Sequence, residues 1–354
     1  MIEKIVFKDY KAFKGMHELK IKPITLLVGK NSSGKSSLCR MVQMLSWAVN
    51  QSIPGNTLFL NYDGVSLGKR YEDLFTNGLQ VGLRFELRYT NPQHELTLEY
   101  FINEGVLDLS HYEIDESAEM DSSNALSFYT SYIGPIRQTP PYIYAFEGMF
   151  KYHSVGATGE HAMALLVDSY KTDKVLYNNV SNWFKDNLEG QELIINEIPE
   201  CGAYECKIRT ANSAYETNLR DVGYGISQLL PIIVETYLES TNVVTIIEQP
   251  ALHVHPAAHE AIAKRLVESA KSLKKTYIIE SHSENILLTF RKLISDRSNA
   301  FSPEDIVIYY IDKDKEGAFL KEITINENGE LSSWPVGVYG ESFEIVKDIL
   351  ANHQ

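Results

Sequence analysis

The hydrophobic positions of the chain fall into alternating strand-like and helix-like segments. In the C-terminal third, apolar runs of five or six residues alternate with stretches whose apolar residues recur every three or four positions. Strands that alternate with helices indicate a largely parallel sheet with helices packed on its faces. The pattern predicts strands at 243–247, 276–280 and 306–311, and helices at 227–239, 256–273 and 284–295.

The N-terminal part begins with a similar pattern and then changes. Residues 2–8 and 19–28 are predicted strands, and the spacing of apolar residues predicts a helix over 35–49. Strict apolar and polar alternation over 79–102 favours two strands joined by the TNPQ turn. A helical pattern at 159–188 precedes further short strands.

These segments suggest three parts of one fold. Residues 1–103, which include an antiparallel β layer, would form one part of its main body, and residues 216–354 would form the other. Residues 104–215 would be an inserted α+β segment. The expected fold class is α/β, with a mostly parallel sheet flanked by helices.

Composition and charge narrow the class of protein. The chain has 354 residues, 44% hydrophobic and 23% charged, as in ordinary soluble proteins. No apolar run reaches the roughly 18 residues that span a bilayer, the N-terminus lacks a signal peptide's apolar middle, and the three cysteines form no CxxC pair. We therefore expect a cytoplasmic protein with no membrane partner. The formal net charge of −14 opposes nonspecific attraction of the whole chain to nucleic acid.

A phosphate-binding loop follows the second predicted strand. The sequence GKNSSGKS at 29–36 matches G-x-x-x-x-G-K-[ST], between a strand and a helix as that motif requires. Backbone N–H groups of such a loop point at phosphates, the lysine binds the β- and γ-phosphates, and the serine binds Mg²⁺. The predicted nucleotide-contacting residues are Gly29, Lys30, Asn31, Ser32, Ser33, Gly34, Lys35, Ser36 and Ser37.

A carboxylate follows the predicted strand at 243–247. A charged residue that ends a buried strand needs a partner, and Mg²⁺ beside a phosphate-binding loop supplies one. Glu248 is therefore the predicted second ligand of Mg²⁺, together with Ser36. ATP and Mg²⁺ are the expected cofactors.

A second glycine-containing turn precedes the predicted helix at 227–239. In LRDVGYGISQ, Gly223 and Gly225 free the backbone, and Ser227 is predicted to cap the helix. The turn is either a second anion site or a simple helix cap.

The order of these motifs resembles an ABC-type ATPase of the RecF/SMC/OLD-like group. GKNSSGKS, DVGYGISQ, TIIEQPALHVHP and IIESHSE carry the resemblance, and the tail at 326–343 resembles the small stand-alone bacterial AAA-family ATPases. The resemblance implies an ATP-bound homodimer or higher oligomer, in which Gly225 and Ser227 contact the γ-phosphate held by a second subunit.

The same resemblance implies further roles. Residues 251–256 would form the D-loop at the dimer seam, and residues 7–13 would lie near the adenine. His282 would be the switch histidine near the γ-phosphate. Gln138 is the candidate for the glutamine that senses Mg²⁺.

Gln249 stands where such enzymes usually have a catalytic glutamate. Glutamine can orient water but cannot accept its proton, and loss of a general base costs about 10²–10⁴ in rate. Phosphoryl transfer depends mostly on positioning, so slow hydrolysis remains possible. Glu280, which ends the neighbouring predicted strand, is a possible substitute acid. The predicted catalytic residues are Lys35, Glu248, Gln249, Glu280 and His282.

Three weaker sequence patterns suggest a metal or nucleic-acid site but also have simpler structural interpretations. His253, His255 and His259 have a spacing that could bind zinc, but no cysteine pair lies near them. The DKDKEG segment at 312–317 resembles a calcium loop but lacks its final glutamate, which favours a hairpin turn. A basic cluster on and after the helix at 256–273 is either a solvated face or a contact for a DNA backbone; it comprises Lys264, Arg265, Lys271, Lys274 and Lys275.

Several roles in the cell are compatible with this sequence. Family analogy suggests a switch subunit of a DNA-transaction or antiviral defence system that acts on a separate effector, such as a nuclease. The alternative is a non-hydrolysing ATP-binding scaffold that assembles or restrains a partner. A transporter's ATPase subunit is disfavoured because the segment at 104–215 is unlike a transporter's helical subdomain.

Overall fold

The computed structural model describes residues 1–50, 58–62, 64–76, 82–90, 93–103, 106–114, 127–145, 152–211 and 215–333. Its helices are α1 (Lys35–Asn50), α2 (Ala162–Lys171), α3 (Val175–Asn187), α4 (Tyr224–Tyr237), α5 (His259–Ser272) and α6 (Glu284–Ser295). Short 3₁₀ turns occur at Tyr71–Leu74, Pro256–Ala258 and Pro303–Asp305.

The strands include those predicted at 2–8, 243–247, 276–280 and 306–311, whereas the strand at Tyr129–Ile133 was not predicted. They are β1 (Ile2–Tyr10), β2 (Phe13–Lys20), β3 (Ile24–Gly29), β4 (Asn61–Tyr62), β5 (Val65–Ser66), β6 (Leu83–Thr90), β7 (Gln93–Asn103), β8 (Val106–Ile114), β9 (Tyr129–Ile133), β10 (Tyr144–Ala145), β11 (Glu192–Ile198), β12 (Ala203–Arg209), β13 (Glu216–Asn218), β14 (Val243–Glu248), β15 (Thr276–Glu280), β16 (Ile306–Lys313) and β17 (Ala318–Ile323). The predicted strand at 19–28 is in fact two, because β2 ends at Lys20 and β3 begins at Ile24.

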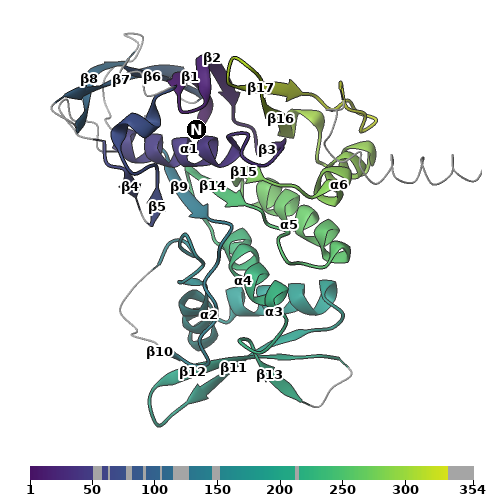
Figure 1. The fold of residues 1–354 in the computed structure, drawn as a ribbon. Coiled ribbons are helices and arrows are strands. Elements are labelled where there is room, and N and C mark those ends of the chain that lie inside the picture. Colours follow the sequence, from purple (N-terminus) through teal and green to yellow (C-terminus); the bar gives the residue numbers. More distant parts are fainter. Residues whose placement is uncertain are drawn as a thin grey trace, which may run out of the picture.

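One large sheet organises the molecule (Figure 1). Its order is β8-β7-β6-β1-β2-β17-β16-β3-β15-β14-β9, with eleven strands. The five strands β16, β3, β15, β14 and β9 run parallel to one another, whereas β8 to β2 form an antiparallel layer. β17 lies between these parts and pairs antiparallel with β16. The predicted α/β class, with a parallel sheet and an antiparallel N-terminal layer, is confirmed.

The predicted inserted segment at 104–215 is divided between two sheets. β8 and β9 pair within the large sheet, whereas β10, β11, β12 and β13 form a second, four-stranded sheet. Figure 1 shows this small sheet with α2 and α3 beside it, and α4 between them and the large sheet. The glycine-containing turn at 223–227, at the start of α4, is therefore carried by a helix that lies between the small sheet and the large one (Figure 1).

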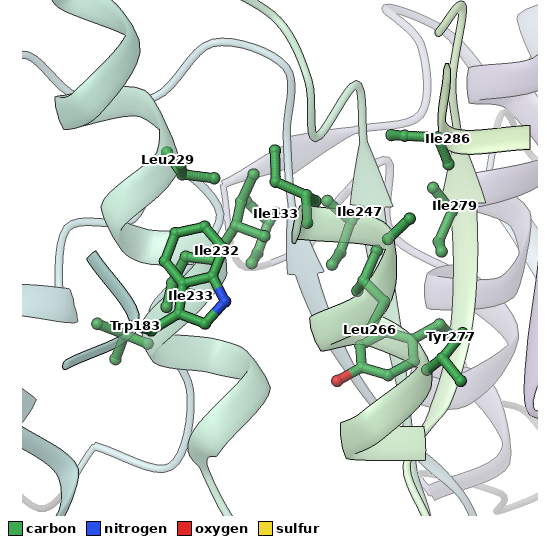
Figure 2. Close-up of a cluster of buried hydrophobic side chains, with 14 of the residues drawn as sticks. Ile133, Trp183, Leu229, Ile232, Ile233, Ile247, Leu266, Tyr277, Ile279 and Ile286 are labelled. Carbon is green, nitrogen blue, oxygen red and sulfur yellow. The ribbon is translucent and has the colours of Figure 1, made fainter. Parts of the chain in front are cut away.

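The central strands are buried on both faces. Ile246 and Ile278 pack with α1 on one face, while Ile247 and Ile279 pack on the other face with α4, α5 and α6. Figure 2 shows this second cluster, in which side chains of α4 and α5 meet those of β14 and β15. Burial on two faces explains why these strands appear in the sequence as continuous apolar runs.

Two buried cations fix the C-terminal end of α4. Lys275 Nζ donates to the carbonyls of Glu235 (2.6 Å) and Leu238 (2.9 Å), and Arg265 donates to the carbonyl of Thr236 (3.0 Å). Burial lowers the pKa of Lys275 and raises the pKa of Glu235, whose carboxylate lies 3.8 Å from Lys275 Nζ. Cations near a helix C-terminus satisfy its free carbonyls and its dipole.

These contacts correct the interpretation of the basic cluster as one solvated face. Arg265 and Lys275 are buried, so they face the core and not solvent. Lys264 pairs with Glu260 and Lys271 with Asp305. Most of the cluster is therefore already paired within the chain.

Candidate nucleotide-binding site

The loop at 29–36 connects β3 to α1, as predicted. Gly29 has a φ of 147°, and a Cβ there would lie 2.0 Å from the carbonyl oxygen of Ile311 on β16. Only glycine fits at that position, because the loop turns directly beside the neighbouring strand. Gly34 is similarly confined, with the ring of Phe13 2.9 Å from where a Cβ would stand.

Lys35 lies inside the loop. Its Nζ donates to the carbonyls of Gly29 (3.0 Å) and Lys30 (2.7 Å), and only 3% of the residue is exposed. Burial lowers the pKa of this ammonium. The lysine therefore holds the loop in an open ring whose backbone N–H groups are free to face an anion.

A pocket of about 390 Å³ adjoins this loop. It brings together the loop, the ends of β14 and β15, and the turn after β1. Its lining residues are Ala12, Asn31, Ser32, Gly34, Lys35, Ser36, Ser37, Gln249, Glu280, His282 and Lys313. Gln249, Glu280 and His282, singled out from the sequence, thus share one pocket with the loop.

Two carboxylates end neighbouring parallel strands beside this pocket. Glu248 of β14 and Glu280 of β15 are register partners, and both are buried. Glu280 Oε2 accepts a 2.7 Å hydrogen bond from Ser36 Oγ, and Glu248 Oε1 accepts one of 2.6 Å from Tyr132. Burial, and next the charge of Glu248, raise the pKa of Glu280.

This arrangement suits a hard divalent cation. Oxygen atoms of Glu248 and Glu280 lie within 4.8 Å of each other and of the Cys39 sulfur. Among the described residues, this is the one cluster of three or more acidic, cysteine or histidine side chains that could hold a metal ion. Mg²⁺ prefers oxygen ligands and uses one or two carboxylates beside substrate phosphates. Ser36 Oγ and the two carboxylates supply such oxygens, whereas burial raises the pKa of Cys39 and keeps its thiol protonated.

Gln249 has an unusual backbone conformation. Its φ is 49°, in the left-handed region, and its N–H donates to the carbonyl of Glu280 (2.7 Å). Its carbonyl oxygen accepts from Leu252 N–H at 3.1 Å. His282 lies across the pocket, and burial lowers its pKa, so the imidazole is neutral at pH 7.

The turn before α4 differs from the prediction in one respect. Gly223, not Ser227, is the N-cap of α4, so the predicted cap is wrong. Ser227 lies within the first turn, is 5% exposed, and donates its hydroxyl to the carbonyl of Tyr224 (2.8 Å). Gly225 packs against the D-loop segment, since a Cβ there would lie 2.4 Å from the carbonyl oxygen of His253.

Gln138 lies away from the phosphate-binding loop. It is exposed and lines a small, separate pocket with Ser227 and Pro231. Its neighbour Arg137 points at the end of β14 instead. No local sequence pattern indicates Arg137 or Tyr132, because their contacts depend on β9 lying beside β14.

The weaker patterns have ordinary structural explanations. His255 Nδ1 accepts from Ala257 N–H, and His259 bonds Val254 and Ser283, so the histidines do not converge on a common point. Residues 312–317 form the turn of the β16–β17 hairpin, as predicted. Residues 334–343 of the tail that carried the family resemblance lie outside the described residues.

Comparison with known proteins agrees with this geometry. Residues 157–287 match an AAA ATPase domain, and residues 301–347 match a protein family of unknown function, DUF3696. No curated protein sequence matches the chain. None of the helices among the described residues is both long and apolar enough to cross a bilayer.

Solved structures of SMC heads share the fold. A crystal structure of the SMC head bound to the C-terminal winged-helix domain of ScpA has a TM-score of 0.59 at 13% identity, covering 91% of this chain and 98% of that one. An SMC head with an extended coiled coil, bound to the C-terminal domain of ScpA derived from Pyrococcus furiosus, has a TM-score of 0.53 at 11% identity. The match covers 98% of this chain and 99% of that one.

Proposed function

Taking the chain as an AAA ATPase of the ABC and SMC-like type, we propose that it binds Mg-ATP between two copies and hydrolyses it slowly. The observation that carries this proposal is the shared pocket of the loop at 29–36, Glu280, Gln249 and His282. The triphosphate would replace the bonds that Lys35 now makes to loop carbonyls.

The residues around the pocket divide the chemistry between them. Lys35 and the loop N–H groups would hold the β- and γ-phosphates, and Ser36 and Glu248 would hold Mg²⁺. Bound Mg²⁺ would neutralise charge that develops on the phosphate oxygens. Gln249 would orient the attacking water, and neutral His282 would bond the γ-phosphate.

Glu280 is the candidate for the missing general base. A carboxylate can accept the proton that the Gln249 amide cannot. Glu280 lies in the pocket that Gln249 also lines, 2.7 Å from Ser36 Oγ. Slow hydrolysis would follow from the absence of a carboxylate at position 249 itself.

A second subunit would complete the site. The turn at 223–227 lies outside the pocket lined by the loop of its own chain, so it would face a γ-phosphate held by another chain. The exposed part of this turn is Gly223 and Tyr224, whereas Ser227 is buried and would have to turn outward to reach a phosphate. ATP would thereby favour the dimer by binding it better than the monomer.

The dimer would switch a separate effector, such as a nuclease, in a cytoplasmic DNA-transaction or antiviral defence system. This part rests on family analogy. Nucleic acid remains a candidate trigger. The alternative, a non-hydrolysing scaffold, is favoured by one observation: Gln249 cannot accept a proton.

Phosphate release by the purified chain separates the two hypotheses. Wild type is compared with Lys35→Ala and Gln249→Glu at several protein concentrations. Slow hydrolysis predicts release well above Lys35→Ala, a rate per chain that rises with concentration, and a faster Gln249→Glu. Equal background release by wild type and Lys35→Ala would support the scaffold. Turnover at tens per second with no gain in Gln249→Glu would contradict the slow-hydrolysis proposal.

A further inference from the structure

Arg137 connects the two parts of the candidate site. It is 2% exposed, and its Nη2 donates to the carbonyl oxygens of Glu248 (2.7 Å) and Gln249 (3.3 Å). These are the residue that would hold the metal and the residue that would orient water. The guanidinium thus contacts the chain where β14 ends.

The backbone of Arg137 is bound to α4. Its N–H donates to Gln228 Oε1 (3.3 Å), and Gln228 Nε2 donates back to the Arg137 carbonyl (3.4 Å). Gln228 follows Ser227 in the first turn of α4 and is itself 1% exposed. A single residue therefore links the start of α4 to the end of β14.

The segment that Arg137 contacts requires outside support. Gln249 has a positive φ, a conformation that costs a non-glycine residue free energy and persists only when the surroundings enforce it. The Glu280 carbonyl binds its N–H, and Arg137 contacts its carbonyl oxygen. Arg137 is therefore one of the groups that hold the Gln249 backbone, together with the Glu280 carbonyl and Leu252 N–H.

Arg137 is not placed to maximise stability. Its Nε and Nη1 have no hydrogen-bond partner among the described residues, and buried unpaired donors cost free energy. Burial lowers its pKa to about 10, which still leaves it charged at neutral pH. A buried guanidinium with two unpaired donor nitrogens beside a candidate active site indicates a functional constraint.

We propose that Arg137 is a positioning residue that couples the placement of α4 to that of Gln249. When the turn at 223–227 engages a nucleotide, the shift of α4 would move Gln228 and Arg137, and with them the Glu248–Gln249 peptide. Hydrolysis would then be fast only in the engaged dimer. This inference rests on the proposed function.

The test compares wild type with Arg137→Met, Arg137→Lys and Arg265→Met in the full chain. Arg265 is a matched control, since it is a buried arginine that binds the opposite end of α4. Three quantities are measured: affinity for a fluorescent ATP analogue with Mg²⁺, kcat, and amide hydrogen exchange of peptides covering 247–254 and 276–281.

For Arg137→Met we expect an unchanged affinity within about threefold, a fall in kcat on the order of 10²-fold, and faster exchange at 247–254 only. Arg137→Lys keeps a hydrogen-bond donor, so it should recover part of the kcat and part of the exchange protection at 247–254. Arg265→Met should change neither kcat nor exchange at 247–254. If Arg137→Met does not fold, Arg137→Lys and Gln228→Met supply the same comparison.

Unchanged exchange at 247–254 in the Arg137 variants would overturn the proposal, and so would an unchanged kcat. If wild type hydrolyses no faster than Lys35→Ala, the proposed function fails. The exchange measurement still decides in that case whether Arg137 positions Gln249.

Discussion

Ser36 and Glu280 are joined by a 2.7 Å hydrogen bond although 244 residues separate them in the chain. The serine lies in the first turn of α1, at the end of the phosphate-binding loop, and the carboxylate ends β15. β15 lies directly between β3 and β14, so the loop and both acids meet at one edge of the sheet. Ligands of open α/β sheets commonly bind at this edge.

The two acids should respond differently to amide substitution. Glu280→Gln keeps a hydrogen-bond acceptor for Ser36 but cannot take a proton, so kcat should fall about 10²–10⁴-fold with ATP affinity nearly unchanged. Glu248→Gln should instead abolish the Mg²⁺-dependent part of ATP affinity. Steady-state kinetics and a fluorescent-nucleotide titration measure both effects, with the surface variant Glu322→Gln as the control. Full kcat in Glu280→Gln would exclude it as the base.

The two glycines before and within α4 provide a matched pair. A Cβ at Gly225 would lie 2.4 Å from the carbonyl of His253, whereas a Cβ at Gly223 meets nothing within 4 Å. Gly225→Ala should therefore displace the 251–256 segment and lower thermal stability by about 1–3 kcal/mol, as overpacking does. Gly223→Ala meets no clash but replaces a favourable N-cap residue, so its loss of stability should be smaller, below about 1 kcal/mol. Equal melting temperatures for both variants would contradict the observed packing.

Removing one partner of the buried Glu235–Lys275 pair should be strongly destabilising. Lys275→Met leaves a buried carboxylate without its cation and should cost about 3–5 kcal/mol in unfolding free energy. Glu235→Gln combined with Lys275→Met should recover much of this loss, because no unpaired charge remains. Urea unfolding of the two single variants and the double variant measures the coupling, and additive effects would show that the pair does not interact.

Lys11 should give the folded protein a distinct pH dependence. Burial, assisted by Arg40, lowers its pKa to about 8, whereas an unfolded lysine titrates near 10.4. Between these values only the unfolded chain holds the proton, so the free energy of unfolding rises with pH. Urea unfolding of Lys11→Met should therefore lack the contribution of Lys11 to the rise in unfolding free energy between about pH 7.5 and 9.5. The control variant Lys8→Met, at an exposed lysine, should retain this contribution. Equal slopes of unfolding free energy against pH in wild type and both variants would refute the lowered pKa of Lys11.

The elements that local spacing determines were predictable from sequence. The loop at 29–36 and the acid after VVTII carry their signals within a few residues, and so does the alternation that defines the parallel strands. The hydrogen bonds of Ser36 to Glu280 and of Arg137 to Gln249 carry no such signal. They depend on which strands become neighbours and on their register, as does the membership of β8 and β9 in the large sheet.

The buried cations at the end of α4 illustrate the same limit. A run of lysines and arginines on a helix usually indicates a solvated face. Arg265 and Lys275 instead point at the last carbonyls of another helix, which the sequence of α5 alone does not reveal.

The placement of Lys35 has a kinetic consequence. Because its ammonium already spans the loop between the carbonyls of Gly29 and Lys30, the ring is preformed before any nucleotide arrives. An entering triphosphate replaces the two carbonyls as the partner of the Lys35 ammonium, so its binding needs no slow refolding of the loop. Stopped-flow mixing should therefore give a single exponential whose observed rate constant increases linearly with nucleotide concentration.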